Sequence, residues 1–156
     1  MLYQSASGDA GVGTSIYTMK DSTMTCLNGA MFYCTNTDSI INLENNEFIL
    51  SEDNTLLIVS KGRWGKDGSN GGSCILNATN QSLSGDIIVD EISSLELNLN
   101  SSNYEGTISS NGYTVVNLDN NSTWSLTGDS YISEFNGDIY SIITNGYTLY
   151  VNGIAL

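Results

Sequence analysis

An internal repeat with a period of roughly 21 residues is the feature that most constrains what this chain can fold into. Three segments align on their glycines: residues 82–87 with Gly85, 103–108 with Gly106, and 125–130 with Gly128. Each is preceded by an alternating, strand-like stretch, at residues 75–78, 95–99 and 114–118. A repeat of this length with several short strands and no helical period predicts units that stack on one another.

Such units are typical of a parallel β-helix, whose coils stack about 4.8 Å apart. We therefore predict that the 156 residues form an all-β solenoid of about seven coils with a period of roughly 21–22 residues. Glycine and asparagine suit its turns, and asparagine can also stack with itself between coils. The absence of proline agrees, because the ladder needs almost every backbone N–H. The predicted inward residues are Ile87, Leu97, Ile108, Val116 and Leu118.

An antiparallel β-sandwich is the competing architecture, since it also has short strands and frequent turns. Two-residue hairpin signals are missing at most junctions, which disfavours it. A second echo, residues 111–117 against 145–152, is interpreted as further internal repetition.

The composition excludes several functions. The chain has 17 acidic and 4 basic residues, a formal net charge of −13 and no histidine. It therefore lacks an imidazole base or ligand, and it would repel a nucleic-acid backbone. Apolar stretches reach only about five residues, too short for membrane insertion or a signal-peptide core. Because Met1 is followed at once by strand-like residues, we expect residues 1–156 to be a single β-helix domain, a segment of a longer protein.

The three cysteines are Cys26, Cys34 and Cys74, and their spacing disfavours a zinc site. One interpretation is that all three are small buried apolar residues. The other is a disulfide between Cys26 and Cys34, which would leave Cys74 unpaired.

A glycine-rich insertion at residues 61–72 interrupts the repeat and holds three of the four basic residues. Insertions in a solenoid project from one face, commonly the binding face. An aromatic ring can stack on a sugar, and polar side chains can fix its hydroxyl groups. The candidate ligand-binding residues are therefore Arg63, Trp64, Lys66, Asp67 and Asn70, with an acidic polysaccharide as the ligand. The alternative is that Trp64 covers an exposed rung of the core.

A calcium site is the metal hypothesis, since Asp86, Asp90 and Glu91 lie close in sequence and calcium prefers several oxygen ligands. The sequence has no EF-hand loop and no nonapeptide calcium repeat, so solvated acidic side chains are the alternative. No other cofactor is expected.

Several motifs resemble those of a known group of proteins: residues 31–37, 63–65, 80–86, 122–129 and 146–153. Over most of residues 3–153 the chain resembles large secreted right-handed β-helix proteins of Gram-positive gut bacteria, described as adhesin-like or carbohydrate-binding domain proteins. The resemblance implies a right-handed coil and a secreted or cell-surface location. These motifs are structural, so they carry over no catalytic residue. A related β-helix family binds pectic polysaccharide with calcium, but no motif of this chain maps onto that activity.

We expect a non-enzymatic extracellular or cell-surface β-helix that supports adhesion or carbohydrate contact, including host or cell-surface glycans. A polysaccharide-degrading fragment of the pectate-lyase-like type and a purely structural spacer are the alternatives. Residues 1–14 look like a poor cap, and an uncovered coil edge is a template for pairing. End-to-end self-association is therefore also expected.

Overall fold

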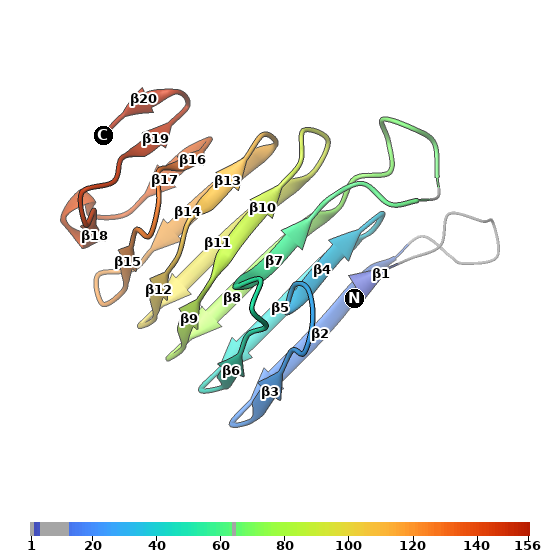
Figure 1. Cartoon of the computed structure of the whole chain (residues 1–156), viewed down its shortest axis with the longest axis horizontal. Coiled ribbons are helices and arrows are strands. Elements are labelled where there is room, and N and C mark those ends of the chain that lie inside the picture. Colours follow the sequence, from blue (N-terminus) through green and yellow to red (C-terminus); the bar gives the residue numbers. More distant parts are fainter. Residues whose placement is uncertain (1, 4–12, 64) are drawn as a thin grey trace.

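The computed structural model describes residues 2–3, 13–63 and 65–156, which form short strands and one 3-10 helix, Ile139–Ser141. Parallel strands of successive coils pair into long sheets, and the coils stack as a β-solenoid of about seven turns (Figure 1). The predicted parallel β-helix is confirmed, and the antiparallel sandwich is excluded. Within the described residues, β19 and β20 form the one antiparallel pair.

Each full coil passes through three faces in turn. The first sheet contains β1 (Leu2–Tyr3), β4 (Phe32–Thr35), β7 (Thr55–Val59), β10 (Asp86–Val89), β13 (Ile108–Ser110), β16 (Ser130–Ile132), β19 (Leu149–Val151) and β20 (Ile154–Ala155). The second sheet contains β2 (Thr14–Lys20), β5 (Asp38–Glu44), β8 (Ser73–Thr79), β11 (Ser94–Asn100), β14 (Tyr113–Leu118) and β17 (Glu134–Asn136).

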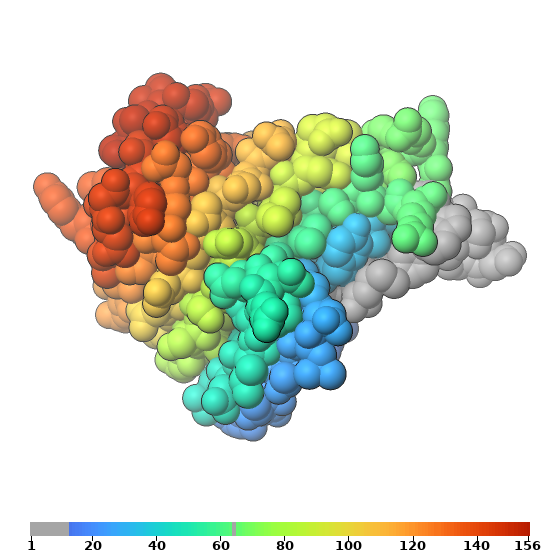
Figure 2. Space-filling view, in the orientation of Figure 1, coloured from blue at the N-terminus to red at the C-terminus, as the bar shows by residue number. Residues whose placement is uncertain are grey.

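The third face is divided into two separate sheets. One contains β3 (Thr23–Thr25) and β6 (Glu47–Ile49), and the other contains β9 (Ser82–Ser84), β12 (Asn103–Glu105), β15 (Thr123–Ser125) and β18 (Ile142–Ile143). The first two coils reach the next first-sheet strand through residues 26–31 and 50–54, whereas Gly85 alone connects β9 to β10. Figure 2 shows the teal segment around residues 50–54 standing forward of its neighbours. The change from long to short connections coincides with the split, since β6 and β9 belong to different sheets.

The core is a set of stacked apolar rungs, because alternate residues of each strand point inward. In β8, β11 and β14, Leu76, Leu97 and Val116 lie opposite one another and are fully buried. The five predicted inward residues are all confirmed, with exposed fractions between 0% and 7%.

The outer side of the second sheet carries an asparagine ladder. Starting at Asn136, each side-chain amide donates to the carbonyl oxygen of the asparagine one coil earlier, over 2.7–2.9 Å. The members are Asn42, Asn77, Asn98, Asn117 and Asn136. Their sequence separations are 35, 21, 19 and 19 residues, so coil length varies while the stack is kept. The predicted stacking of asparagine therefore occurs on a sheet face as well as at turns.

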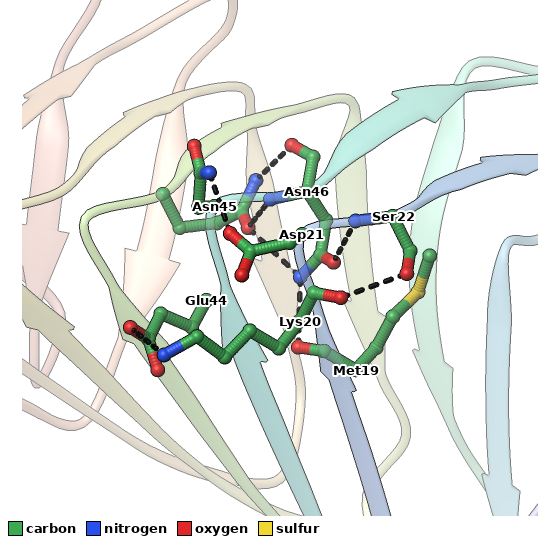
Figure 3. Close-up of polar contacts among 8 residues, drawn as sticks. Met19, Lys20, Asp21, Ser22, Glu44, Asn45 and Asn46 are labelled. Carbon is green, nitrogen blue, oxygen red and sulfur yellow. Dashed lines mark hydrogen bonds and ion pairs between the residues drawn. The ribbon is translucent and has the colours of Figure 1, made fainter.

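At the corner that follows the second sheet, one residue in each of the first four coils has a left-handed backbone conformation. Asp21, Asn45, Asn80 and Ser101 hold it with φ between 47° and 52°, a region that asparagine and aspartate tolerate better than most residues. The Asn45 amide also donates to the Asp21 carboxylate at 2.7 Å, as Figure 3 shows. The sharp turn is thus stabilised within each coil and between coils.

Behind this corner runs an inner chain of polar groups. The backbone N–H of one coil donates to the side-chain oxygen of the equivalent residue in the next: Ser22 to Asn46 (3.2 Å; Figure 3), Asn46 to Gln81 (2.8 Å), Gln81 to Ser102 (3.0 Å) and Ser102 to Ser122 (3.0 Å). Gln81, Ser102 and Ser122 are buried, and buried polar groups require such partners. The core is therefore closed on this side by hydrogen bonds as well as by apolar contacts.

Asp119 directly follows β14, and its hydrogen bonds predict that the stability of the fold depends on pH. Its carboxylate accepts hydrogen bonds from the Ser122 hydroxyl (2.5 Å) and from the N–H groups of Ser101 and Asn121 (3.1 Å), and these lower its pKa below the usual 3.8. A depressed folded-state pKa stabilises the fold above the unfolded-state value, and this stability is lost as the pH falls through the lower folded value. Asp119→Asn should therefore reduce the loss of stability below pH 3.8, measured as the urea midpoint at each pH. If the urea midpoint of Asp119→Asn falls as steeply below pH 3.8 as that of the parent, this role of Asp119 is contradicted.

Candidate functional site

The insertion at residues 61–72 joins β7 to β8 at the corner between the first and second sheets, and Figure 1 shows it as a long green loop. Its base is closed by two hydrogen bonds between Gly62 and Asn70. Gly62 N–H donates to the Asn70 carbonyl at 2.9 Å, and the Asn70 side-chain amide donates back to the Gly62 carbonyl at 2.7 Å. Asn70 is only 6% exposed. This predicted ligand residue therefore closes the loop instead of facing outward.

The loop is anchored to the coil that follows it. The Lys61 N–H donates to the Asp90 carboxylate at 2.7 Å, and the other oxygen of Asp90 accepts from Ile92 N–H at 3.3 Å. A Cβ atom on Gly71 would lie 2.1 Å from the Ile92 carbonyl oxygen, so only glycine permits this approach. The base of the loop is thus seated tightly on the solenoid.

The charged tip of the loop lies outside these contacts. Arg63, Lys66 and Asp67 are all exposed, and a turn with Ser69 N–H bonded to the Lys66 carbonyl at 2.9 Å holds the tip. The predicted role of Trp64 falls outside the described residues. The arrangement presents two basic side chains and one acidic side chain to solvent from a fixed base.

The three predicted calcium ligands do not come together. Asp86 begins β10 and Asp90 follows its end, so this extended strand separates their backbones by about 13 Å. The Asp86 carboxylate accepts from Thr107 N–H at 3.1 Å, and Glu91 is exposed. In the part of the chain that the structure describes, no group of three His, Cys, Asp or Glu side chains could hold a metal ion. Asp90 instead anchors the loop, a link that sequence spacing did not indicate.

A shallow groove of about 440 Å³ lies on the third face, around the place where its sheet is split. Phe48 lines it on the β6 side and Leu83 on the β9 side, and the carboxylates Glu47 and Glu105 lie along its length. The inserted loop leaves the solenoid at a different corner, between the first and second sheets. The groove and the loop are therefore two distinct surface features.

An aromatic pair on the outer side of the first sheet was missed by the sequence reasoning. Tyr131 of β16 lies opposite Tyr150 of β19, and their rings stack 4.8 Å apart at an angle of 5°. The alternation in Ser130–Ile132 and Leu149–Val151 was the available signal, because it places each tyrosine outward. The similar stretches at residues 111–117 and 145–152 lie at different places in the coil, since Tyr113 begins a second-sheet strand whereas Tyr147 precedes a first-sheet strand.

No family model, curated protein or solved structure matches the chain. Among the described residues, none lies in a helix long and apolar enough to cross a membrane.

Proposed function

We propose that this β-helix is a non-enzymatic binding rod, extracellular or on a cell surface, that contacts an acidic polysaccharide through the loop at residues 61–72. The observation that carries the proposal is the loop's construction: a base fixed by Asn70 and Asp90 and a basic tip exposed to solvent. A fixed base lowers the entropy lost when the tip binds a ligand. Outer faces rich in hydroxyl and amide groups agree with a solvated surface role.

Charge supports an anionic ligand. The loop holds Lys61, Arg63 and Lys66 against one acid, Asp67, a net charge of +2. The whole chain carries −13, so the remainder carries −15. A basic tip on so acidic a chain attracts a polyanion locally, and the rest of the surface opposes non-specific adsorption.

The test is binding of polygalacturonate to the chain at low and at high salt. Arg63→Ala should weaken binding, and replacing both Arg63 and Lys66 by alanine should weaken it about tenfold or more, since two contacts to carboxylates are then lost. Added salt should weaken binding of the parent, because the attraction between exposed charges decays over about 10 Å at 0.1 M salt and over a shorter distance at higher salt. Trp64→Ala should also weaken binding while leaving the melting temperature nearly unchanged. Isothermal titration calorimetry gives the affinities.

Lys20→Ala is the matched control, because Lys20 is the one basic residue outside the loop. It lies at the end of β2, where it pairs with Glu44 at 2.6 Å (Figure 3). Its removal changes the net charge by the same amount as Arg63→Ala without touching the loop. The proposal fails if the parent shows no binding at low salt, or if Lys20→Ala weakens binding as much as Arg63→Ala does.

The groove on the third face favours a second candidate, cleavage of a polysaccharide. Glycoside hydrolysis uses a pair of carboxylates beside the scissile bond, and Glu47 and Glu105 line the groove. This candidate requires new reducing ends to appear when the polymer is incubated with the chain, and Glu47→Gln to abolish them. Binding without cleavage supports the non-enzymatic proposal.

A further inference from the structure

The two buried cysteines meet inside the core. Cys34 lies on β4 of the first sheet and Cys74 on β8 of the second sheet, one coil later. Their exposed fractions are 0% and 1%, and their sulfur atoms are 3.5 Å apart. Both are free thiols in the structure, as is Cys26.

Cys26 lies apart from this pair. Its thiol is directed at the carbonyl oxygens of Asn28, Gly29 and Ala30, at 3.2–3.6 Å. The hypothesis of a Cys26–Cys34 disulfide is therefore not supported, and the structure offers a different partner for Cys34. Sequence spacing could not indicate this partner, because 40 residues separate Cys34 from Cys74.

The pair lies at the foot of the inserted loop. The Cys34 carbonyl accepts a hydrogen bond from Ser60 N–H (3.1 Å), just before the loop. At the other end of the loop, a Cβ atom on Gly72 would lie 2.7 Å from the same carbonyl oxygen. The chain thus leaves and returns at Cys34, and Cys74 follows shortly after Gly72. A bond between the two sulfur atoms would tie the first sheet to the second where the loop is seated.

We propose that Cys34 and Cys74 form a disulfide when the chain folds under oxidising conditions. The two thiols lose two protons and two electrons, the S–S bond forms, and glutathione disulfide as the oxidant is reduced to two glutathione thiols. The sulfur atoms must approach from 3.5 Å to about 2.05 Å, the length of an S–S bond. The bond would close a loop that contains the whole insertion.

The chemistry of the pair indicates when the bond forms. The hydrogen bond with Cys34 and burial both raise the pKa of the Cys74 thiol. Exchange needs a thiolate that the oxidant can reach, and both thiols are buried in the folded chain, so the folded and reduced core should oxidise slowly. Oxidation during refolding, before the coils close, should be much faster.

Tryptic mapping tests the proposal on the full chain. The chain is refolded from guanidinium in glutathione disulfide, free thiols are blocked with N-ethylmaleimide, and trypsin is added without reduction. Cleavage after Lys20, Lys61 and Lys66 gives peptide 21–61, which holds Cys26 and Cys34, and peptide 67–156, which holds Cys74. The proposal expects these two peptides to be joined, with one maleimide on Cys26. A Cys26–Cys34 bond would instead remain within peptide 21–61.

Two single variants assign the sulfur atoms. Cys26→Ser should keep the joined peptides, and Cys34→Ser should abolish them. In the Cys26→Ser background, oxidation should raise the midpoint of thermal unfolding by about 5–10 °C relative to the reduced chain. Three blocked thiols in the refolded parent, or joined peptides that survive Cys34→Ser, would overturn the proposal. The mapping of the parent decides this even if Cys34→Ser fails to fold.

Discussion

Ile108→Asp is expected to abolish folding at neutral pH. Ile108 is fully buried in β13, where it lies opposite Ile87 of the coil before. The group that faces it from the coil after is Ser130, whose hydroxyl accepts the Ile108 N–H at 3.1 Å and donates to the Gly128 carbonyl at 3.2 Å. Neither neighbouring rung therefore offers a spare donor to a new carboxylate, and burying an unpaired charge costs an amount comparable with the whole stability of a typical domain. Circular dichroism and size-exclusion chromatography give the readout.

The neighbouring residue supplies the control. Ser109 lies on the same strand and is exposed, so Ser109→Asp adds the same charge on the outer side of the sheet. Its effect should stay within about 0.5 kcal/mol, as for most surface substitutions. Ile108→Val should cost about 0.5–1.5 kcal/mol, because it removes one buried methyl group. If Ile108→Asp melts like the parent, the inward assignment of this rung is wrong.

The repeat was sufficient to predict the solenoid because stacking preserves the order of residues within each strand. Gly85 was aligned with Gly106, and the pairing of β9 with β12 sets Ser84 opposite Glu105, which confirms that alignment. The third segment was aligned wrongly at its start. β12 pairs with β15 so that Tyr104 lies opposite Trp124, whereas the sequence alignment set it opposite Leu126.

The physical reason is that the corners lie outside the ladder and can change length freely. Register must be kept within each sheet, because a slip of one residue turns every side chain to the other face. The corner between β15 and β16 is longer than the one between β12 and β13, and Ser109 therefore lies opposite Tyr131. This pair has the same sequence separation as Gly106 and Gly128. Composition and alternation predict strands well, but they do not predict corner lengths.

The candidate site was predicted only in part for the same reason. The break in the repeat predicted the loop, and the sequence showed that it holds three of the four basic residues. Its anchoring by Asp90 and the meeting of Cys34 with Cys74 depend on contacts between coils. Such contacts join residues that lie far apart in the sequence. Their register depends on how the coils stack, which local sequence patterns do not reveal.

Gln81→Met is the second substitution with a large expected effect. Gln81 is 2% exposed and lies just before β9, where the third face is split into two sheets. Its side-chain amide forms hydrogen bonds across this split, where β6 and β9 are not paired. Its Oε1 atom accepts from Asn46 N–H at 2.8 Å, and its Nε2 group donates to the carbonyls of Asn46 (2.7 Å) and Ser82 (2.8 Å). Methionine has a similar length but cannot replace these bonds. Unfolding in urea should show a loss of about 2–4 kcal/mol, because three backbone groups lose their partner.

Ser102→Ala is the graded comparison, since Ser102 continues the same inner chain. Its hydroxyl accepts one hydrogen bond, from Gln81 N–H at 3.0 Å, and donates to the Asn100 carbonyl at 2.8 Å. Its removal should cost about 1 kcal/mol, less than Gln81→Met, if the number of backbone groups left without a partner sets the cost.

The location of the damage distinguishes a sheet-joining role from a general packing role. If the Gln81 amide joins the β3–β6 sheet to the rest of the third face, Gln81→Met should speed amide hydrogen exchange in residues 44–49 while residues 94–118 stay protected. Cleavage by trypsin after Lys20, at the end of β2, should also become faster, because β2 and β3 belong to the coil that β6 supports. Exchange that rises equally in both regions would mean that Gln81 only fills space. Unchanged stability would mean that water replaces the amide at the split.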